Sequence, residues 1–483
     1  MTWLSTSGAW LSRLVFVRGL AVIYLIAFIS AARQFRALMG EHGILPVPAH
    51  LARTGVRQSP SLFHVHYSDR FFAGCCWFGA AAAMASLAGA ADHLPVWGWM
   101  LAWLVLWVLY LSIVNVGQVW YSFGWESLLV ETGFLAVFLG PTALAPPRLI
   151  FWLLRWLLFR LEFGAGLIKL RGDPCWRDLT CLRYHHETQP MPNPLSWYFH
   201  HLPAGMHRVE VLANHITQLV VVFGLFAPQP AAGLAALVIV VTQAWLMLSG
   251  NFAWLNALTL VIALSVVSGG WIHHVLPLAA PAHLSAPTWY AGLVIAVTAG
   301  IAVLSFWPAR NLLSRRQQMN ASFNPLHLVN TYGAFGSVTR VRHEVVVEGT
   351  NDRSPGEGTV WKEYEFKGKP GDPSRRPTQV APYHLRLDWL MWFVGIAPAY
   401  GDPWLIPFLV KLLEDDQATV KLLRRTPFPD GPPALVRARL YRYRFTTAEE
   451  RKATGAWWER TLVGDLVRPI ALRAPAAAPS PPG

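Results

Sequence analysis

Charged residues are scarce in this chain: they make up 14% of its 483 residues, whereas ordinary globular proteins carry about 25%. Cysteine is also rare, and four cysteines do not make a disulfide scaffold in a chain of this length. The sequence has no glycine-rich phosphate loop, no Gly-x-Ser-x-Gly elbow, no His-Glu-x-x-His motif and no dinucleotide fingerprint. These absences disfavour ATP-driven transport, hydrolase chemistry and dehydrogenase chemistry. No basic helix with a stacking motif accompanies the net charge of +13, so we expect no nucleic-acid partner.

Hydrophobic residues are abundant instead, at 54% of the chain, and 24 of them are tryptophan. This composition is typical of an integral membrane protein with aromatic residues at the bilayer interfaces. Several apolar segments come close to the ~20 residues that a bilayer-spanning helix needs. They are residues 11–31, 71–90, 95–117, 118–140, 148–170, 209–227, 231–249, 252–268 and 288–307. Because no clear turn separates 95–117 from 118–140, we predict an all-α polytopic bundle of about eight to nine transmembrane helices.

The charges are unevenly distributed along the chain, which predicts a domain boundary. Residues 1–309 hold 15 of the 40 basic residues and 10 of the 27 acidic residues, although they form the longer part. We predict a polytopic transmembrane domain at 1–309 with polar loops at 33–70 and 171–208. A soluble β-rich α+β domain is predicted at 310–470, and the proline- and alanine-rich residues 471–483 are predicted to be disordered.

The C-terminal domain is predicted from strand-like and helix-like patterns. Strand patterns rich in β-branched and aromatic residues cover 343–349, 359–368 and 434–447, and the polar residues between the first two predict a hairpin. Segments 383–396 and 404–425 have amphipathic helical patterns, and we expect them to lie against the bilayer or the sheet.

The number of spans predicts which segments share one side of the membrane. With nine spans, loops 33–70 and 171–208 and the C-terminal domain lie on the same side, and these are the basic segments. The positive-inside rule then places that side in the cytoplasm. Arginine greatly outnumbers lysine and alanine is abundant, which indicates a bacterial genome rich in G and C. The sequence thus predicts a multi-pass protein of a bacterial inner membrane.

A stripe of charged residues lies on the predicted helix 148–170. Arg155, Glu162 and Lys169 are spaced seven apart, so they fall within about 40° of one another on a helix, while Arg160 points elsewhere. Charges at membrane depth face the bundle interior or a water-filled cavity. Two interpretations are open: a structural ion-pair network, or a polar cavity for a substrate or proton. The network would comprise Glu126, Glu131, Arg155, Arg160, Glu162 and Lys169.

The loop that follows this helix is crowded with chemically active side chains. The spacing Cys-x5-Cys-x3-His-His, from Cys175 to His186, matches none of the usual zinc patterns, so we expect no metal site. Cys175 and Cys181 could form a thiol pair, and His185 or His186 could act as a general base. If a reaction occurs, its catalytic candidates are Glu126, Glu131, Glu162, Lys169, His185 and His186. The other interpretation is a rigid, proline-framed interfacial loop without a cofactor.

Residues 160–203, RLEFGAGLIKLRGDPCWRDLTCLRYHHETQPMPNPLSWYFHHLP, resemble the signature of the lipase maturation factor family. The segments 120–135 and 441–460 also resemble that family, so the resemblance covers almost the whole chain. It implies a multi-pass membrane protein, which in animals resides in the endoplasmic reticulum membrane and helps dimeric secreted lipases to reach their active fold. It also implies that loop 171–208 and domain 310–483 contact the client protein on the lumenal or periplasmic side.

The leading hypothesis is therefore a non-catalytic, chaperone-like maturation factor for exported proteins, with membrane lipid and a client, such as a lipase, as partners. The alternative is a membrane-embedded enzyme or thiol-redox protein that acts on a lipid-like substrate in a charged cavity. The sequence does not predict the oligomeric state. The expected client-binding residues all lie in or beside the central loop. They are Arg171, Asp173, Cys175, Trp176, Arg177, Cys181, Tyr184, His185, His186, Glu187, Pro190, Pro194 and Trp197.

Overall fold

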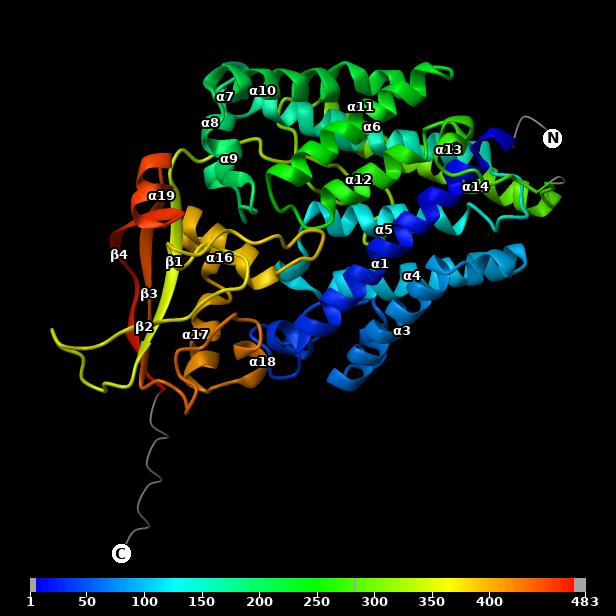
Figure 1. Cartoon of the computed structure of the whole chain (residues 1–483). Coiled ribbons are helices and arrows are strands. Elements are labelled where there is room, and N and C mark those ends of the chain that lie inside the picture. The colour runs from blue at the N-terminus through cyan, green and yellow to red at the C-terminus, as the bar shows by residue number, and fades with distance from the viewer. Residues whose placement is uncertain (1–5, 282–283, 473–483) are drawn as a thin grey trace, which may run out of the picture.

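The computed structural model describes residues 6–281 and 284–472. Helices form the N-terminal part, and a sheet with its covering helices forms the C-terminal part, which packs against one end of the helical part (Figure 1). Most of the predicted disordered tail, from residue 473 on, lies outside the described residues.

The N-terminal part is built from long apolar helices joined by short ones. The long helices are α1 (Trp10–Met39), α3 (Asp69–Leu87), α4 (Val96–Val116), α5 (Gly124–Val137), α6 (Arg148–Arg171), α10 (Ala204–Leu219), α11 (Ala231–Ser249), α12 (Leu255–Leu264) and α14 (Thr288–Leu304). The short ones are η2 (Ser7–Ala9), α2 (Val47–Leu51), η3 (Leu62–His64), η4 (Ala90–His93), η5 (Gln118–Tyr121), η6 (Val221–Phe226), α13 (Gly269–Val275) and α15 (Phe306–Leu313).

Helix α1 runs through the middle of the bundle and packs closely against α3 (Figure 1). The close approach depends on Gly79, because a Cβ atom there would lie 2.6 Å from the ring of Phe28. Phe28 and Tyr24 of α1 are fully buried, and both rings pack edge-on against Tyr110 of α4. Edge-to-face aromatic pairs of this kind add about 0.5–1.5 kcal/mol to the stabilisation that burial of the rings provides.

Among the described residues, six helical segments are long and apolar enough to cross a membrane, and a seventh is possible if the pair α12 and α13, bent by 111°, is one span. The six are Trp10–Met39, Asp69–Leu87, Val96–Val116, Ala204–Phe226, Ala231–Ser249 and Thr288–Leu313. The predicted eight to nine spans are therefore not confirmed by length and composition. Predicted span 118–140 contains α5, which has 14 residues and is only about 21 Å long at 1.5 Å per residue. Predicted span 148–170 is a continuous helix of 24 residues, but α6 carries several charges.

The chain runs back and forth between two ends of the helical part. At the first end, here called the loop end, Gln34 near the C-terminus of α1 donates a hydrogen bond to the carbonyl oxygen of His384. At the opposite end, here called the far end, Ser12 donates a hydrogen bond to the carbonyl oxygen of Val267. Loop 171–208, with α7 (Pro174–Arg177), α8 (Leu182–Thr188) and α9 (Ser196–His200), lies at the loop end together with the C-terminal part (Figure 1).

The C-terminal part contains a four-stranded antiparallel sheet of order β2-β1-β3-β4. Its strands are β1 (Arg342–Thr350), β2 (Lys362–Glu363), β3 (Leu435–Phe445) and β4 (Trp458–Ile470). Strands β1 and β3 cover two of the predicted strands, and β1 with β2 forms the predicted hairpin, although β2 is much shorter than expected. The sequence interpretation missed β4, a strand of 13 residues at the sheet edge.

Helices cover one side of this sheet and separate it from α1 (Figure 1). They are α16 (Arg386–Ile396), η7 (Pro398–Gly401), α17 (Leu405–Leu413) and α18 (Gln417–Val420), and α19 (Ala448–Thr454) joins β3 to β4. Both predicted amphipathic segments are helical. Helix α16 packs on β1 and α17 on β3, and α18 contacts α1. The apolar faces of α16 and α17 are therefore buried inside the protein, against the sheet.

Candidate functional site

The central loop is mostly an internal structure. The side chains of Cys175, Trp176, Cys181, His185, His186, Pro190 and Trp197 are buried, whereas Arg171 and Arg177 are exposed. Asp173, Tyr184, Glu187 and Pro194 are partly buried. In this conformation, more than half of the predicted client-binding side chains are therefore inside the protein and not at its surface.

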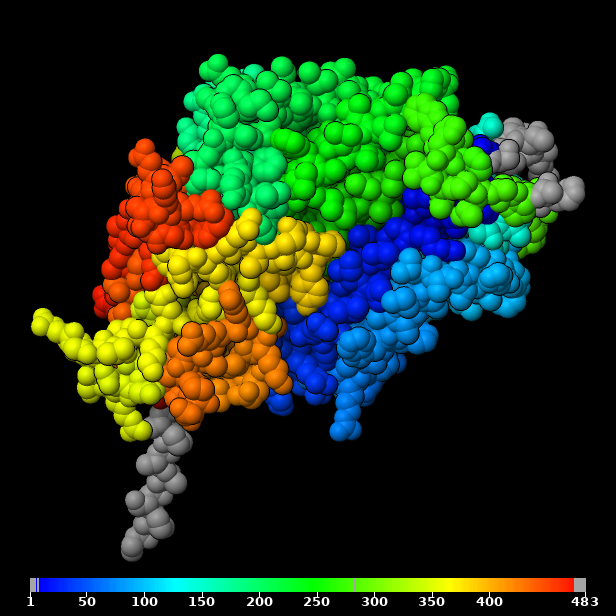
Figure 2. Space-filling model, viewed as in Figure 1, coloured from blue at the N-terminus to red at the C-terminus, as the bar shows by residue number. Residues whose placement is uncertain are grey.

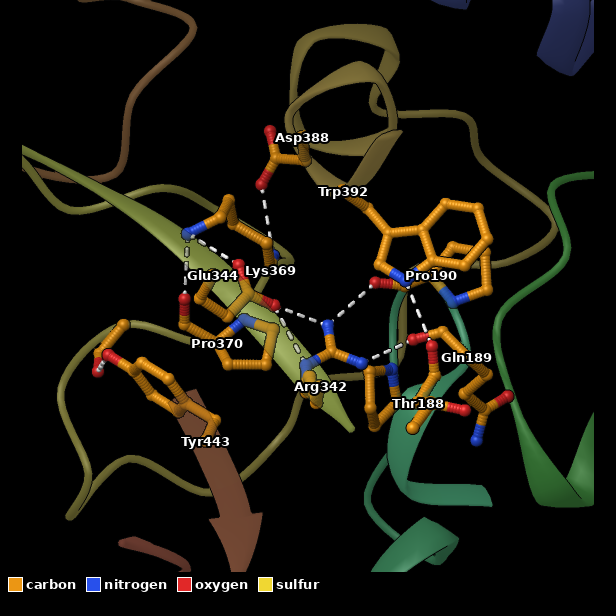
Figure 3. A network of polar contacts seen from close by, with 12 residues as sticks. Thr188, Gln189, Pro190, Arg342, Glu344, Lys369, Pro370, Asp388, Trp392 and Tyr443 are labelled. Carbon is orange, nitrogen blue, oxygen red and sulfur yellow. Dashed lines mark hydrogen bonds and ion pairs between the residues drawn. The ribbon is translucent and has the colours of Figure 1, made fainter. Parts of the chain in front are cut away.

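Arg342 at the start of β1 joins this loop to the sheet (Figure 3). Its guanidinium donates hydrogen bonds to the carbonyl oxygens of Glu187, Gln189 and Pro190, and it also pairs with the carboxylate of Glu344. The guanidinium is fully buried. Arginine suits this position because its planar fork presents several donors in fixed directions.

The same cluster extends into the interior of the C-terminal part (Figure 3). Nζ of Lys369 lies 2.9 Å from Oε2 of Glu344, so this buried carboxylate faces two cations. The backbone amides of Gly368 and Lys369 donate hydrogen bonds to Oδ1 of Asp388 in α16. Burial raises the pKa of Asp388, and these two amide donors act against that shift. We call Arg342, Glu344, Lys369 and Asp388 the Arg342 network.

Tryptophan side chains add further bonds between the loop and the C-terminal part. Nε1 of Trp392 donates to the carbonyl oxygen of Thr188 at 2.9 Å, and Nε1 of Trp197 donates to that of Thr446 at 2.8 Å. The Glu187 carboxylate accepts from the backbone amide of Phe445 at 2.7 Å. In Figure 2 the blue-green surface around the loop adjoins the orange-red surface of the C-terminal part. The loop and the sheet therefore form one continuous unit.

Glu126 pairs with a residue of the C-terminal part and not with the charged stripe of α6. Nη1 of Arg386 lies 2.5 Å from Oε1 of Glu126, and both side chains are fully buried. The hydroxyl of Tyr110 donates to the other carboxylate oxygen, and Arg386 also donates to the carbonyl oxygen of Trp120 at 2.8 Å. The ring of Tyr121 lies below the guanidinium, 3.5 Å from its carbon to the ring centroid. This ion pair fixes the start of α16 inside the helical part.

Glu131 pairs with Arg160 of α6 in a second buried site. The Glu131 carboxylate also accepts hydrogen bonds from the backbone and side-chain nitrogens of Asn330 and from the hydroxyl of Tyr332. Arg160 in turn donates to the carbonyl oxygen of Asn330 at 2.6 Å. Segment 314–341, which has no regular helix or strand, is thereby held against α5 and α6.

Glu162 and Lys169 form a third site through neutral amides. Gln218 donates to Glu162 at 3.0 Å and accepts from Nζ of Lys169 at 2.9 Å, so it bridges the two charges. Gln243 also donates to Glu162, at 2.6 Å. Arg155 lies apart, with its guanidinium over the ring of Trp152. Of the six charged residues expected in one network, five are thus distributed over three separate sites, and Arg155 belongs to none of them.

These contacts argue against a catalytic cavity built from the predicted candidates. Each of the carboxylates of Glu126, Glu131 and Glu162 accepts hydrogen bonds from protein donors. His185 is buried between the rings of Phe252 and Phe335, and burial lowers its pKa to about 3. A histidine of such low basicity is a poor general base at neutral pH.

Cys175 and Cys181 form a disulfide with a Cα–Cα distance of 4.8 Å. Both residues are buried in a small cluster that includes Trp176 and Val211. Thiol–disulfide exchange needs access of the attacking thiolate to a sulfur atom. Burial therefore favours a structural role for this disulfide over a catalytic one.

Several residues of these sites were missed by sequence reasoning. Arg342, Lys369 and Arg386 belong to a charged region that was expected to be a soluble domain, where an arginine carries no signal of burial. Gln218 and Gln243 lie in apolar segments, and a polar side chain at such a position was the signal that could have placed them beside a buried charge. Polar amides inside apolar segments commonly form hydrogen bonds with charged groups of neighbouring helices.

Known protein families and individual proteins match this chain along nearly its whole length. Residues 11–274 match the lipase maturation factor transmembrane domain, and residues 328–468 match the lipase maturation factor C-terminal domain. Human lipase maturation factor 1 is 40% identical over 97% of this chain and 89% of its own length. The bovine protein of that name is 42% identical over 95% of this chain and 89% of its own. Chicken lipase maturation factor 2 is 31% identical over 96% of this chain and 82% of its own length. No solved structure matches. The chain belongs to the lipase maturation factor family.

Proposed function

We propose that this protein is a non-catalytic membrane factor that helps exported lipases to reach their active fold. The proposal rests on family membership across both parts of the chain, because relatives named for lipase maturation cover 95% or more of it. The neutralised carboxylates and the buried disulfide support a binding role over an enzymatic one.

The observation that carries the client-binding role is the rigid connection between loop and sheet. The Arg342 network and the Trp392 bond hold the loop at three successive backbone carbonyls, those of residues 188, 189 and 190. A surface that is ordered before binding loses less conformational entropy when a partner docks. We place client contact at the residues of the loop that reach the surface, among them the exposed Arg171 and Arg177.

The finer membrane topology of this proposal has nine crossings. Contacts at the far end join the start of α1 to Val267 and join Tyr290 of α14 to Phe138. Contacts at the loop end join Asn251 to Met191. Helix α5 and helix α12, with 14 and 10 residues, are shorter than the ~30 Å hydrocarbon core requires. Most of their residues are buried against neighbouring helices, so lipid does not need to cover their ends.

The disulfide supports placing the loop end on the exported side of a bacterial inner membrane. Disulfides persist in the periplasm and in secretory compartments and are rare in the cytosol. This orientation is opposite to the cytoplasmic one predicted from basic residues. The positive-inside rule counts short loops and not long domains, and many of the arginines in question belong to the folded C-terminal part. Arg342, Arg386 and Arg460, for example, are each paired with a carboxylate there.

Gene deletion in the organism that encodes this chain tests the function. We expect the amount of exported lipase to change little and its activity per unit of lipase protein to fall several-fold. A parallel test places the chain in animal cells that lack lipase maturation factor 1 and secrete a lipase. Restoration by the wild-type chain supports the proposal. Unchanged lipase specific activity in the deletion strain would contradict it.

A further inference from the structure

A buried cluster of two histidines and one carboxylate lies where the central loop meets α10. His186 of α8, His207 and Glu210 each offer one ligand atom, and these atoms all lie within 4.8 Å of one another. Nε2 of His186 is 3.6 Å from Oε2 of Glu210, and Nδ1 of His207 is 3.2 Å from that same oxygen. Ligands about 2.1 Å from a tetrahedral zinc ion lie about 3.4 Å from one another. The distances of 3.6 and 3.2 Å are close to that spacing.

The contacts around His207 aim one ring nitrogen at the carboxylate. Nε2 of His207 lies 3.3 Å from the carbonyl oxygen of His200, which can only accept, so Nε2 donates there. The other ring nitrogen, Nδ1, faces Oε2 of Glu210. A cation between Nδ1 and Oε2 would be coordinated by both atoms. A ring nitrogen that donates to a backbone carbonyl is also the usual outer support of a metal-bound histidine.

His186 supplies an independent observation. Its side chain is 3% exposed, and neither ring nitrogen has a hydrogen-bond partner among the described residues. Buried polar groups without partners are uncommon and costly. The ring lies between Phe199 and His207, with Nε2 directed toward Glu210. A metal ion at this position would give Nε2 its missing partner.

A hydrogen bond from α11 also orients the carboxylate of Glu210 toward the two histidines. Nε1 of Trp245 in α11 donates to Oε1 of Glu210 at 2.9 Å, which leaves Oε2 free to face both histidines. The donor set of two imidazoles and one carboxylate is found in zinc sites, where a water molecule takes the fourth position. From these contacts we infer that His186, His207 and Glu210 bind one zinc ion, which ties α8 of the central loop to α10.

The site differs from the cysteine-containing spacing that sequence analysis rejected. The second cluster of possible ligands, Asp173, Cys175 and Cys181, has its two sulfur atoms joined in a disulfide, so it offers no thiolate. In sequence, the new site appears only as His207-x-x-Glu210 on one helical face, with His186 distant from it. Because the three side chains are almost fully buried, the ion is expected to exchange slowly and to act structurally.

Metal analysis of the full-length protein in detergent tests this inference. The cells are grown with zinc and the purified protein is dialysed against a mild chelator. We then expect elemental mass spectrometry to find about one zinc ion per chain. His186→Ala and Glu210→Gln should each retain less than about a tenth of that zinc. His201→Ala is the matched control, because His201 is an exposed neighbouring histidine that bonds the carbonyl oxygen of Trp197, and it should keep full zinc.

X-ray absorption at the zinc edge gives a readout that does not depend on variants. Nitrogen and oxygen ligands at about 2.0–2.1 Å are expected, without sulfur at about 2.3 Å. A sulfur ligand would assign the metal to Cys175 and Cys181 and overturn the proposal. So would a monodisperse wild-type protein that holds less than about a tenth of a zinc per chain and takes up none on titration. Equal zinc in wild type and in His186→Ala would overturn it as well.

Discussion

Nη1 of Arg386 lies 2.5 Å from Oε1 of Glu126, although the two residues are 260 positions apart in the chain. One belongs to a helix of the C-terminal part and the other to a helix of the apolar bundle. The C-terminal part is therefore anchored inside the bundle by a fully buried ion pair, with the ring of His384 3.7 Å from the same carboxylate.

Loss of one member of this pair should be more harmful than loss of both. Arg386→Met leaves an uncompensated buried carboxylate, and removing one partner of a buried pair costs about 3–5 kcal/mol. The double variant Glu126→Gln with Arg386→Met removes both charges and should recover part of that stability. Thermal unfolding in detergent, followed by fluorescence size-exclusion chromatography, measures the stability of the wild type, of each single variant and of the double variant. Additive losses in the double-mutant cycle would show that the two residues are not coupled.

Substitution of Arg342 should release the central loop from the sheet. Arg342→Lys keeps the charge, but an ammonium cannot reach the carbonyl oxygens of Glu187, Gln189 and Pro190 together. We expect a loss of about 3 kcal/mol, because buried carbonyl oxygens lose hydrogen bonds from a charged donor, each worth about 1.5–3 kcal/mol. Limited proteolysis should then cut within 187–195, where we expect the wild type to resist cleavage. Arg468→Lys, at an exposed position of β4, is the control and should leave the cleavage pattern unchanged.

Sequence reasoning could predict the classes of structure but not the pairing of the charges. A lone Glu131 in an apolar segment requires a cation, and Arg160 on the adjacent helix is close in sequence. Glu126 requires one as well, but its partner lies in a segment whose arginines look like those of any soluble domain. Helical periodicity gives the direction of a side chain around its own helix, and it contains no information on which distant segment packs there.

The errors in element length have local causes. Predicted span 118–140 ends up as the shorter α5 because Gln118 adopts a positive φ of 50° and η5 interrupts the helix. Strand β4 was missed because Gly464, Asp465 and Pro469 interrupt its pattern of β-branched and aromatic residues. A strand at the sheet edge tolerates such residues, since one side of its backbone needs no partner. Register shifts between β3 and β4 also break the regular alternation that would have indicated a strand.

Acid should weaken the junction at His384. Burial and, to a smaller extent, the charge of the neighbouring Arg386 lower the pKa of His384, while Glu126 raises it, and together they bring this pKa to about 4. Since the ordinary pKa is about 6.5, the unfolded chain binds more protons than the folded one between pH 6.5 and 4. The free energy of unfolding therefore falls as the pH falls through this window, by about 2 kcal/mol at pH 5 for this residue alone.

The difference in melting temperature between pH 7.5 and pH 5 measures this effect. His384→Asn should be less stable at pH 7.5 but should show a smaller difference between the two values. His66→Asn, at an exposed position, should keep the wild-type difference. A full wild-type difference in His384→Asn would assign the acid sensitivity to other buried groups.

The proposed orientation of the loop end, on the exported side of the membrane, can be tested at Asp178, which lies between the two disulfide-bonded cysteines and is exposed. In the variant Asp178→Cys, the new thiol should react in intact cells with a maleimide that crosses the outer membrane but not the inner one. Cys75 and Cys76 are buried in α3, so the wild type supplies the unlabelled background. Arg148→Cys, at the exposed start of α6 at the far end, should react only after the inner membrane is opened. The reverse labelling pattern would place the loop end in the cytoplasm, as the count of basic residues predicts, and would remove the physical basis for contact with an exported client.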